Sequence, residues 1–157
     1  MRTLVLLRHA KSDWSTEQPD AQRPLAERGR RDAPAAGRWL TSNVERIDLV
    51  VCSPAIRARQ TWDLAGAELH GPPVRFDERV YATSAPDLLA LVRALPDDVG
   101  TVVLVGHNPG MEDLASALAG QNVPMKTSSV AVLSWPGTWT DAGSDGGRLT
   151  AHATPRG

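Results

Sequence analysis

Three short apolar runs along the chain contain almost no polar residues. They occupy residues 4–7, 49–52 and 102–105. A strand with one face in water alternates apolar and polar residues, whereas an uninterrupted run is typical of a strand covered on both faces. The pattern therefore predicts three buried strands of a parallel sheet that is flanked by helices.

Apolar residues at helical spacing fill the segments between these runs. Ala33, Gly37, Leu40 and Val44 fall on one face of a predicted helix at about 28–44, and Pro34 predicts that this helix is kinked or begins late. Three more helices are predicted from their apolar stripes, at about 58–69, 88–95 and 111–118.

The starts of the last three helices carry capping signals. Ser53-Pro54 and Asn108-Pro109 each predict an N-cap followed by proline at the first helical position. Ser84 with Asp87 is the spacing of a capping box. Gly120 marks the expected end of the helix that follows Asn108-Pro109.

The C-terminal part has a different pattern. Residues 128–135 and 148–153 read as strands joined by the turn-rich stretch 136–147, and residues 74–76 read as a further short strand. Before them, strands and helices alternate. This order predicts one domain, residues 1–157, with a three-layer α/β/α sandwich around a mainly parallel sheet.

Composition narrows the class of protein. The 157 residues carry a formal net charge of −1, which lacks the positive surplus of a typical nucleic-acid binder. No run approaches the about 18 apolar residues of a membrane span, so we expect a cytoplasmic protein without a membrane partner. Cys52 is the single cysteine and is expected to be a small buried apolar residue. The four histidines are scattered, so neither a metal site nor a cofactor is expected.

Reactive side chains follow directly after the three predicted strands. Arg8 and His9 follow the first, Ser53 and Arg57 the second, and His107 the third. Because ligands of open parallel α/β sheets bind beyond the carboxyl ends of the strands, two histidines and two arginines are predicted to meet at one edge. Two of these strands lead into helix starts, where free N–H groups favour anions.

This set of side chains suits phosphoryl transfer. Arginine binds phosphate oxygens through two N–H groups, and a neutral histidine can be a nucleophile if its other ring nitrogen donates to a carbonyl. Each residue alone has a simpler explanation. A histidine at a strand end often caps a loop, and Arg57 alone would be a solvated helix residue or an ion-pair partner.

The ordered motifs resemble the histidine phosphatase superfamily, and in particular its SixA-like phosphohistidine phosphatase subgroup. Leu7-Arg8-His9-Ala10 resembles the signature Arg-His-Gly, with alanine in place of glycine as in many SixA-like members. Further similar segments are residues 23–29 (RPLAERG), 53–61 (SPAIRARQT), 105–110 (VGHNPG), 147–149 and 154–156. Together they span almost the whole chain.

The resemblance implies a phosphoglycerate mutase-like fold and a role for each strand-end residue. His9 would be the nucleophile that becomes phosphorylated, and Arg8, Arg57 and His107 would complete the phosphate-binding pocket. Lys11, Ser12 and Trp14 lie just beyond the nucleophile, where they could touch substrate, although a structural role for Trp14 is an equal alternative.

Many superfamily members protonate the leaving group with a carboxylate in a segment that here contains Asp77 and Glu78. Neither aligns clearly with that role, and both could instead be surface charges paired with Arg75 or Arg79. A phosphate ester needs such an acid, whereas the imidazole that leaves from phosphohistidine is protonated readily near neutral pH.

These observations lead to three hypotheses. The first is a metal-independent phosphatase that acts on phosphohistidine of a protein through phospho-His9. The second is a phosphatase of a small phosphorylated metabolite, for which Glu78→Gln should be damaging. The third is a non-catalytic module that binds a phosphorylated ligand. A mutase is disfavoured because it must hold a second phosphate group in a more enclosed site. We expect a monomer, because no long apolar helix stripe is left over.

Overall fold

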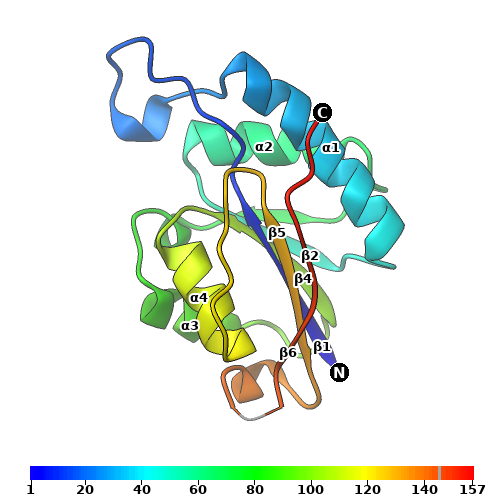
Figure 1. Ribbon diagram of the computed structural model, residues 1–157. Coiled ribbons are helices and arrows are strands. Elements are labelled where there is room, and N and C mark those ends of the chain that lie inside the picture. The colour runs from blue at the N-terminus through cyan, green and yellow to red at the C-terminus, as the bar shows by residue number, and fades with distance from the viewer. Residues whose placement is uncertain (145) are drawn as a thin grey trace.

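The three apolar runs form adjacent parallel strands at the centre of a six-stranded sheet (Figure 1). They are β1 (Arg2–Arg8), β2 (Leu49–Cys52) and β4 (Thr101–Gly106). This computed structural model describes residues 1–144 and 146–157. The strand order is β3-β2-β4-β1-β5-β6, in which β3 is Val74–Phe76, β5 is Val130–Trp135 and β6 is Arg148–Ala153. The pairs β1–β4, β2–β4 and β2–β3 are parallel, whereas β5 is antiparallel to both of its neighbours. The predicted mainly parallel α/β sheet is therefore confirmed.

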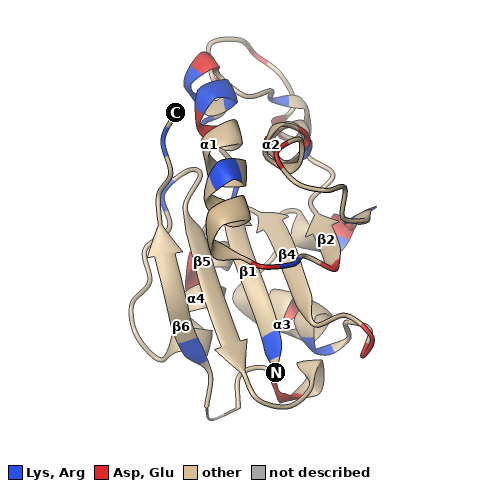
Figure 2. Ribbon diagram, turned by 90° about the vertical axis from the view of Figure 1, so that its right-hand side faces the viewer, with Lys and Arg blue, Asp and Glu red and all other residues tan. Residues whose placement is uncertain are grey.

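Helices cover both faces of the sheet, and the central strands are apolar on both sides for that reason. Figure 2 shows α1 (Glu27–Asn43) and α2 (Ile56–Gly66) in front of the sheet, with α3 (Ala85–Arg93) and α4 (Gly110–Ala119) behind it. Val5 and Leu7 of β1 pack in the core under α1 and α2, whereas Leu4 and Leu6 pack in the core under α3 and α4. No helix in the described part of the chain is both long and apolar enough to cross a bilayer.

The first helix does not begin late. α1 starts at Glu27 and continues through Pro34 to Asn43. Ala33, Gly37 and Leu40 of this helix are buried, as its apolar face predicts.

Two of the predicted helix caps are displaced. α2 begins at Ile56 rather than at Pro54, because the Ser53 hydroxyl accepts a hydrogen bond from Ala55 N (3.2 Å) and closes a turn before the helix. α4 begins at Gly110 with Pro109 in the cap position, although Asn108 Oδ1 still accepts a hydrogen bond from Glu112 N (3.2 Å).

Other expectations differ in detail. Ser84 is the N-cap of α3 as predicted, but its hydroxyl donates to the Asp87 carboxylate instead of forming the capping-box bonds. Trp135 and Trp139, which flank a turn, are both buried, and their rings pack edge-to-face at 5.6 Å in the core under α3 and α4. Cys52 is buried as predicted.

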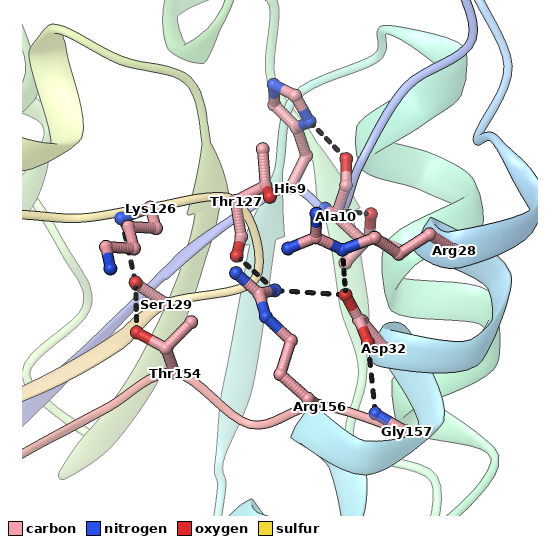
Figure 3. Close-up of polar contacts among 11 residues, drawn as sticks. His9, Ala10, Arg28, Asp32, Lys126, Thr127, Ser129, Thr154, Arg156 and Gly157 are labelled. Atoms are coloured by element: carbon pink, nitrogen blue, oxygen red, sulfur yellow. Dashed lines mark hydrogen bonds and ion pairs between the residues drawn. The ribbon is translucent and has the colours of Figure 1, made fainter.

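The segment after β6 is fastened to α1 through a buried carboxylate (Figure 3). Asp32, which is 1% exposed, accepts hydrogen bonds from Arg156 Nη1 (3.0 Å) and Gly157 N (3.0 Å) and pairs with Arg28 Nε (3.3 Å). Arg156 Nη1 also donates to the carbonyl oxygen of Thr127 (2.8 Å). Asp32 thus links α1, the C-terminal segment and the loop before β5.

We expect Asp32→Asn to destabilise the fold. The amide has no charge to pair with Arg28 and Arg156, and its NH₂ group would place a donor opposite their N–H donors. The free energy of unfolding should fall by about 1–3 kcal/mol. Urea unfolding followed by tryptophan fluorescence measures it. Asp63→Asn, on the exposed side of α2, is the control and should change stability by less than about 0.5 kcal/mol. Equal losses in both variants would contradict the role given to Asp32.

Candidate active site

A cavity of about 400 Å³ lies at the carboxyl ends of β1, β2 and β4. It contains all four residues that the strand-end pattern predicted to converge. The residues that line it are Arg8, His9, Lys11, Ser12, Trp14, Asp20, Arg57, Tyr81, Ala82, His107, Asn108 and Thr127. The predicted meeting of Arg8, His9, Arg57 and His107 at one edge of the sheet is therefore observed.

His9 is buried, and its protonation state is fixed by its surroundings. Its Nδ1 lies 2.7 Å from the carbonyl oxygen of Ala10, which can only accept, so Nδ1 carries the proton (Figure 3). Burial lowers the pKa of His9 to about 3, with smaller contributions from the charges of Arg57 and Arg8. The imidazole is therefore neutral near pH 7, with its lone pair on Nε2.

Backbone hydrogen bonds on both sides hold His9 in place. His9 N donates to the carbonyl oxygen of Gly106 (3.0 Å), and the His9 carbonyl accepts from Ser128 N (3.1 Å). The next residue is held as well, since Ala10 N donates to Thr61 Oγ1 (3.0 Å) and the same hydroxyl donates to the Arg57 carbonyl (2.6 Å). Thr61 thereby connects the segment after β1 to the helix that carries Arg57.

The second histidine faces the first. The ring centroids of His9 and His107 are 5.1 Å apart, and His107 Nε2 lies 2.7 Å from the hydroxyl of Ser53. Burial lowers the pKa of His107 to about 4, and the charge of Arg57 acts in the same direction, whereas Asp20 opposes it. Ser53 therefore orients a site residue instead of capping the helix directly.

The two arginines are held differently. Arg8 Nη1 donates to the carbonyl oxygen of Met125 (3.0 Å), which also accepts from Asn108 Nδ2 (2.8 Å). Within the described chain, Arg8 Nε and His107 Nδ1 are buried nitrogens without a hydrogen-bond partner. Arg57 is 7% exposed and donates through Nη1 to the backbone carbonyl of Asp20 (2.6 Å) and through Nη2 to its carboxylate (2.9 Å).

Asp20 and Tyr81 are site residues that the sequence patterns did not reveal. Asp20 begins the 3-10 turn η1 (Asp20–Gln22), and its Oδ2 also accepts a hydrogen bond from Tyr81 Oη (2.7 Å). These bonds, first that from Tyr81 and then that from Arg57, lower the pKa of Asp20, which is therefore ionised at neutral pH. Both residues lie in loops without apolar periodicity, so no pattern pointed to them.

Residues 23–29, one of the family-like segments, hold the loop after His9 against the helices. Leu25 is fully buried, and its backbone N–H donates to Gln60 of α2 (2.8 Å). A Cβ at Gly29 would lie 2.2 Å from the carbonyl oxygen of Lys11, so only glycine permits this close approach. Trp14, in the same loop after His9, is 61% exposed at the rim of the pocket, and its ring stacks on the Arg23 guanidinium at 3.9 Å.

Neither acidic residue proposed as a proton donor lines the pocket. Asp77 pairs with Arg79 (2.7 Å) and with Arg75 (3.9 Å). It therefore forms the ion pairs that were expected from the sequence as the alternative to a proton-donor role. Glu78 is exposed and lies outside the cavity. Among the residues described, no three His, Cys, Asp or Glu side chains gather closely enough to hold a metal ion.

Comparison with known proteins identifies relatives over the whole length. The sequence profile of the histidine phosphatase superfamily (branch 1) matches residues 4–84. An uncharacterized protein of Mycobacterium leprae is 37% identical over 96% of this chain and 100% of its own. A structure from Nakamurella multipartitia, provisionally assigned as the phosphohistidine phosphatase SixA, is 35% identical and superposes with a TM-score of 0.88 over 98% of this chain and 96% of its own. A similarly assigned structure from Agrobacterium tumefaciens is 29% identical, with a TM-score of 0.85 over 98% of both chains. The expected phosphoglycerate mutase-like fold is thereby confirmed.

The two lowered histidine pKa values predict an acid-sensitive fold. The pKa of histidine in the unfolded chain is about 6.5. Below that pH the unfolded chain therefore binds protons that His9 and His107 do not bind in the native state. Their contribution to stability is therefore fully present above about pH 6.5 and is lost as the pH falls. Relative to a His9→Gln/His107→Gln variant, the unfolding free energy of wild type should fall more steeply, by up to about 1.4 kcal/mol per pH unit for each histidine. Urea unfolding at several pH values between about 6 and 4.5 measures this, and parallel slopes would refute it.

Proposed function

The chain belongs to branch 1 of the histidine phosphatase superfamily, and from this premise we propose that it is a phosphatase that transfers a phosphoryl group to His9 and then to water. The favoured substrate is phosphohistidine on a protein. The convergence of Arg8, His9, Arg57 and His107 on one cavity is the observation that carries the proposal. Oxygens of a bound phosphoryl group would accept hydrogen bonds from the two guanidinium groups and, if it is protonated, from His107.

The first step uses the neutral imidazole of His9. Its Nε2 lone pair forms a bond to phosphorus while the bond from phosphorus to the leaving group breaks and its electron pair departs with that group. The Ala10 carbonyl keeps the proton on Nδ1 and stabilises the positive charge that develops on the ring. Arg8 and Arg57 offset the charge on the non-bridging oxygens, as arginines do in phosphoryl transfer.

His107 changes its role when the phosphoryl dianion binds. Without ligand, burial and Arg57 hold its pKa at about 4. A dianion beside the ring favours the imidazolium form, so that His107 donates a hydrogen bond to the phosphoryl group. In the second step, water attacks phosphorus, the bond to His9 Nε2 breaks, and His9 returns to its neutral form as inorganic phosphate leaves.

The acidic groups near the site favour a phosphoramidate over an ester. Asp20 is ionised, Asp77 is paired with arginines, and Glu78 lies outside the pocket. None of the three is placed as a proton donor for an alkoxide, which leaves poorly without one. Imidazole needs no such acid, because it is protonated near neutral pH. No step in this scheme uses a metal ion or a cofactor.

We expect His9→Ala to abolish phosphate release from a phosphohistidine protein in the presence of EDTA, because the nucleophilic nitrogen is lost. Wild type should release phosphate from phosphohistidine faster than from a phosphoserine peptide or a small aryl phosphate, measured as kcat/KM on each. Trapping acid-labile phosphate on wild type but not on His9→Ala would identify the intermediate.

Glu78→Gln is the matched control and should retain activity within about twofold, since this side chain is exposed outside the pocket. A strong loss of ester hydrolysis in this variant would instead favour a small phosphorylated metabolite as substrate. Activity that survives His9→Ala would refute the mechanism, and binding without turnover would favour a phospho-ligand binding module.

A further inference from the structure

Asp20 places a carboxylate inside a pocket that is otherwise built for an anion. Its Oδ2 is held by Tyr81 Oη at 2.7 Å and by Arg57 Nη2 at 2.9 Å, while its backbone carbonyl accepts from Arg57 Nη1. Oδ1 accepts no hydrogen bond from the described residues. The side chain is 50% exposed, so Oδ1 is available to a ligand in the cavity that Asp20 lines.

Arg57 can hold Asp20 and a phosphoryl group at the same time. A guanidinium has five N–H donors, and Asp20 takes two of them. The other three point away from Asp20, and those that face the cavity can donate to phosphate oxygens. A carboxylate beside the phosphate subsite is therefore compatible with phosphate binding, and it lies where part of the substrate beyond the phosphoryl group can reach it.

The chemistry of a phosphorylated imidazole explains what such a carboxylate can do. When the ring nitrogen away from phosphorus is protonated, the phosphorus–nitrogen bond breaks with its electron pair moving to the ring, and neutral imidazole leaves. An acceptor at that distal N–H favours the protonated ring and so favours departure. The Ala10 carbonyl is the corresponding acceptor for His9, since it binds Nδ1, the ring nitrogen away from the nucleophilic Nε2.

We propose that Asp20 determines substrate specificity by accepting a hydrogen bond from the distal N–H of a phosphorylated imidazole, so that this site prefers phosphohistidine to phosphate esters. The inference rests on the proposed phosphatase function. As the phosphorus–nitrogen bond breaks and the bond to His9 Nε2 forms, the distal proton stays on the departing ring and Asp20 stays ionised. An ester has no such N–H, and its developing negative charge is repelled by the carboxylate.

Asp20→Asn tests this role, because it keeps the size of the side chain and removes the charge that the N–H group would bind. We expect kcat/KM for phosphoimidazole to fall about 10- to 100-fold, the worth of a charge-assisted hydrogen bond. The kcat/KM for an aryl phosphate should change by a smaller factor, because an ester offers no N–H to the carboxylate and depends on Asp20 only through Arg57. The measured quantity is the ratio of these two values, since any disturbance of Arg57 affects both substrates and cancels.

Asp13→Asn is the matched control. Asp13 lies in the same loop and carries the same charge, but it bonds to Ser15 N (2.8 Å) and does not line the pocket, so its ratio should equal that of wild type. An unchanged ratio in Asp20→Asn overturns the proposal, whether both activities fall because Arg57 is disordered or both rise because Asp20 merely obstructs the pocket.

Failure of the proposed function gives a different result. If wild type shows no His9-dependent release from either substrate, the phosphatase mechanism itself is wrong. If wild type turns over both substrates and Asp20→Asn keeps their ratio, the mechanism stands and only the role of Asp20 is wrong.

Discussion

The backbone hydrogen bonds at the end of β1 are the constraint on which the site depends. Arg8 N donates to Ser129, His9 N to Gly106, and Ser128 N to the His9 carbonyl, so the strand end is held from both sides. The Ala10 carbonyl then meets His9 Nδ1 and determines which ring nitrogen is free. If the backbone shifted by one residue, the side chain would turn to the other face of the sheet. The neutral state of His9 and the position of its ring therefore depend on the sheet as much as on the histidine itself.

The charges in the pocket favour an anion. Two arginines, the buried His9 and the half-buried His107 share one cavity, and burial together with the arginine charges keeps both imidazoles neutral. Asp20 compensates part of the positive charge through Arg57 and remains ionised because Tyr81 and Arg57 bind it. The result is a pocket with a cationic part, which suits the phosphoryl group of the proposed substrate, and a carboxylate beside it. Under the proposed function, this carboxylate is the group that would distinguish one leaving group from another.

The sequence predicted the parts of the structure that repeat or that lie at strand ends. Uninterrupted apolar runs located the buried strands, and the topology of parallel sheets then brought Arg8, His9, Arg57 and His107 together. Asp20 and Tyr81 were not predicted as site residues, because 3-10 turns and loops without apolar periodicity bring them to the pocket. The displaced caps had another cause, since the polar side chains expected to cap helices were used by tertiary contacts. Ser53, for example, contacts His107 as well as the turn before α2.

The position of β1 in the sheet has a consequence for biosynthesis. β1 leaves the ribosome well before its two partners in the sheet, β4 (Thr101–Gly106) and β5 (Val130–Trp135). Until those segments are made, both edges of an apolar strand lack their native partners, and such edges invite aggregation. Gly106, Ser128 and Ser129, which hold the end of β1, and His107 of the pocket arrive equally late. The nascent chain therefore cannot form the pocket until these segments are made, although His9 is translated long before them.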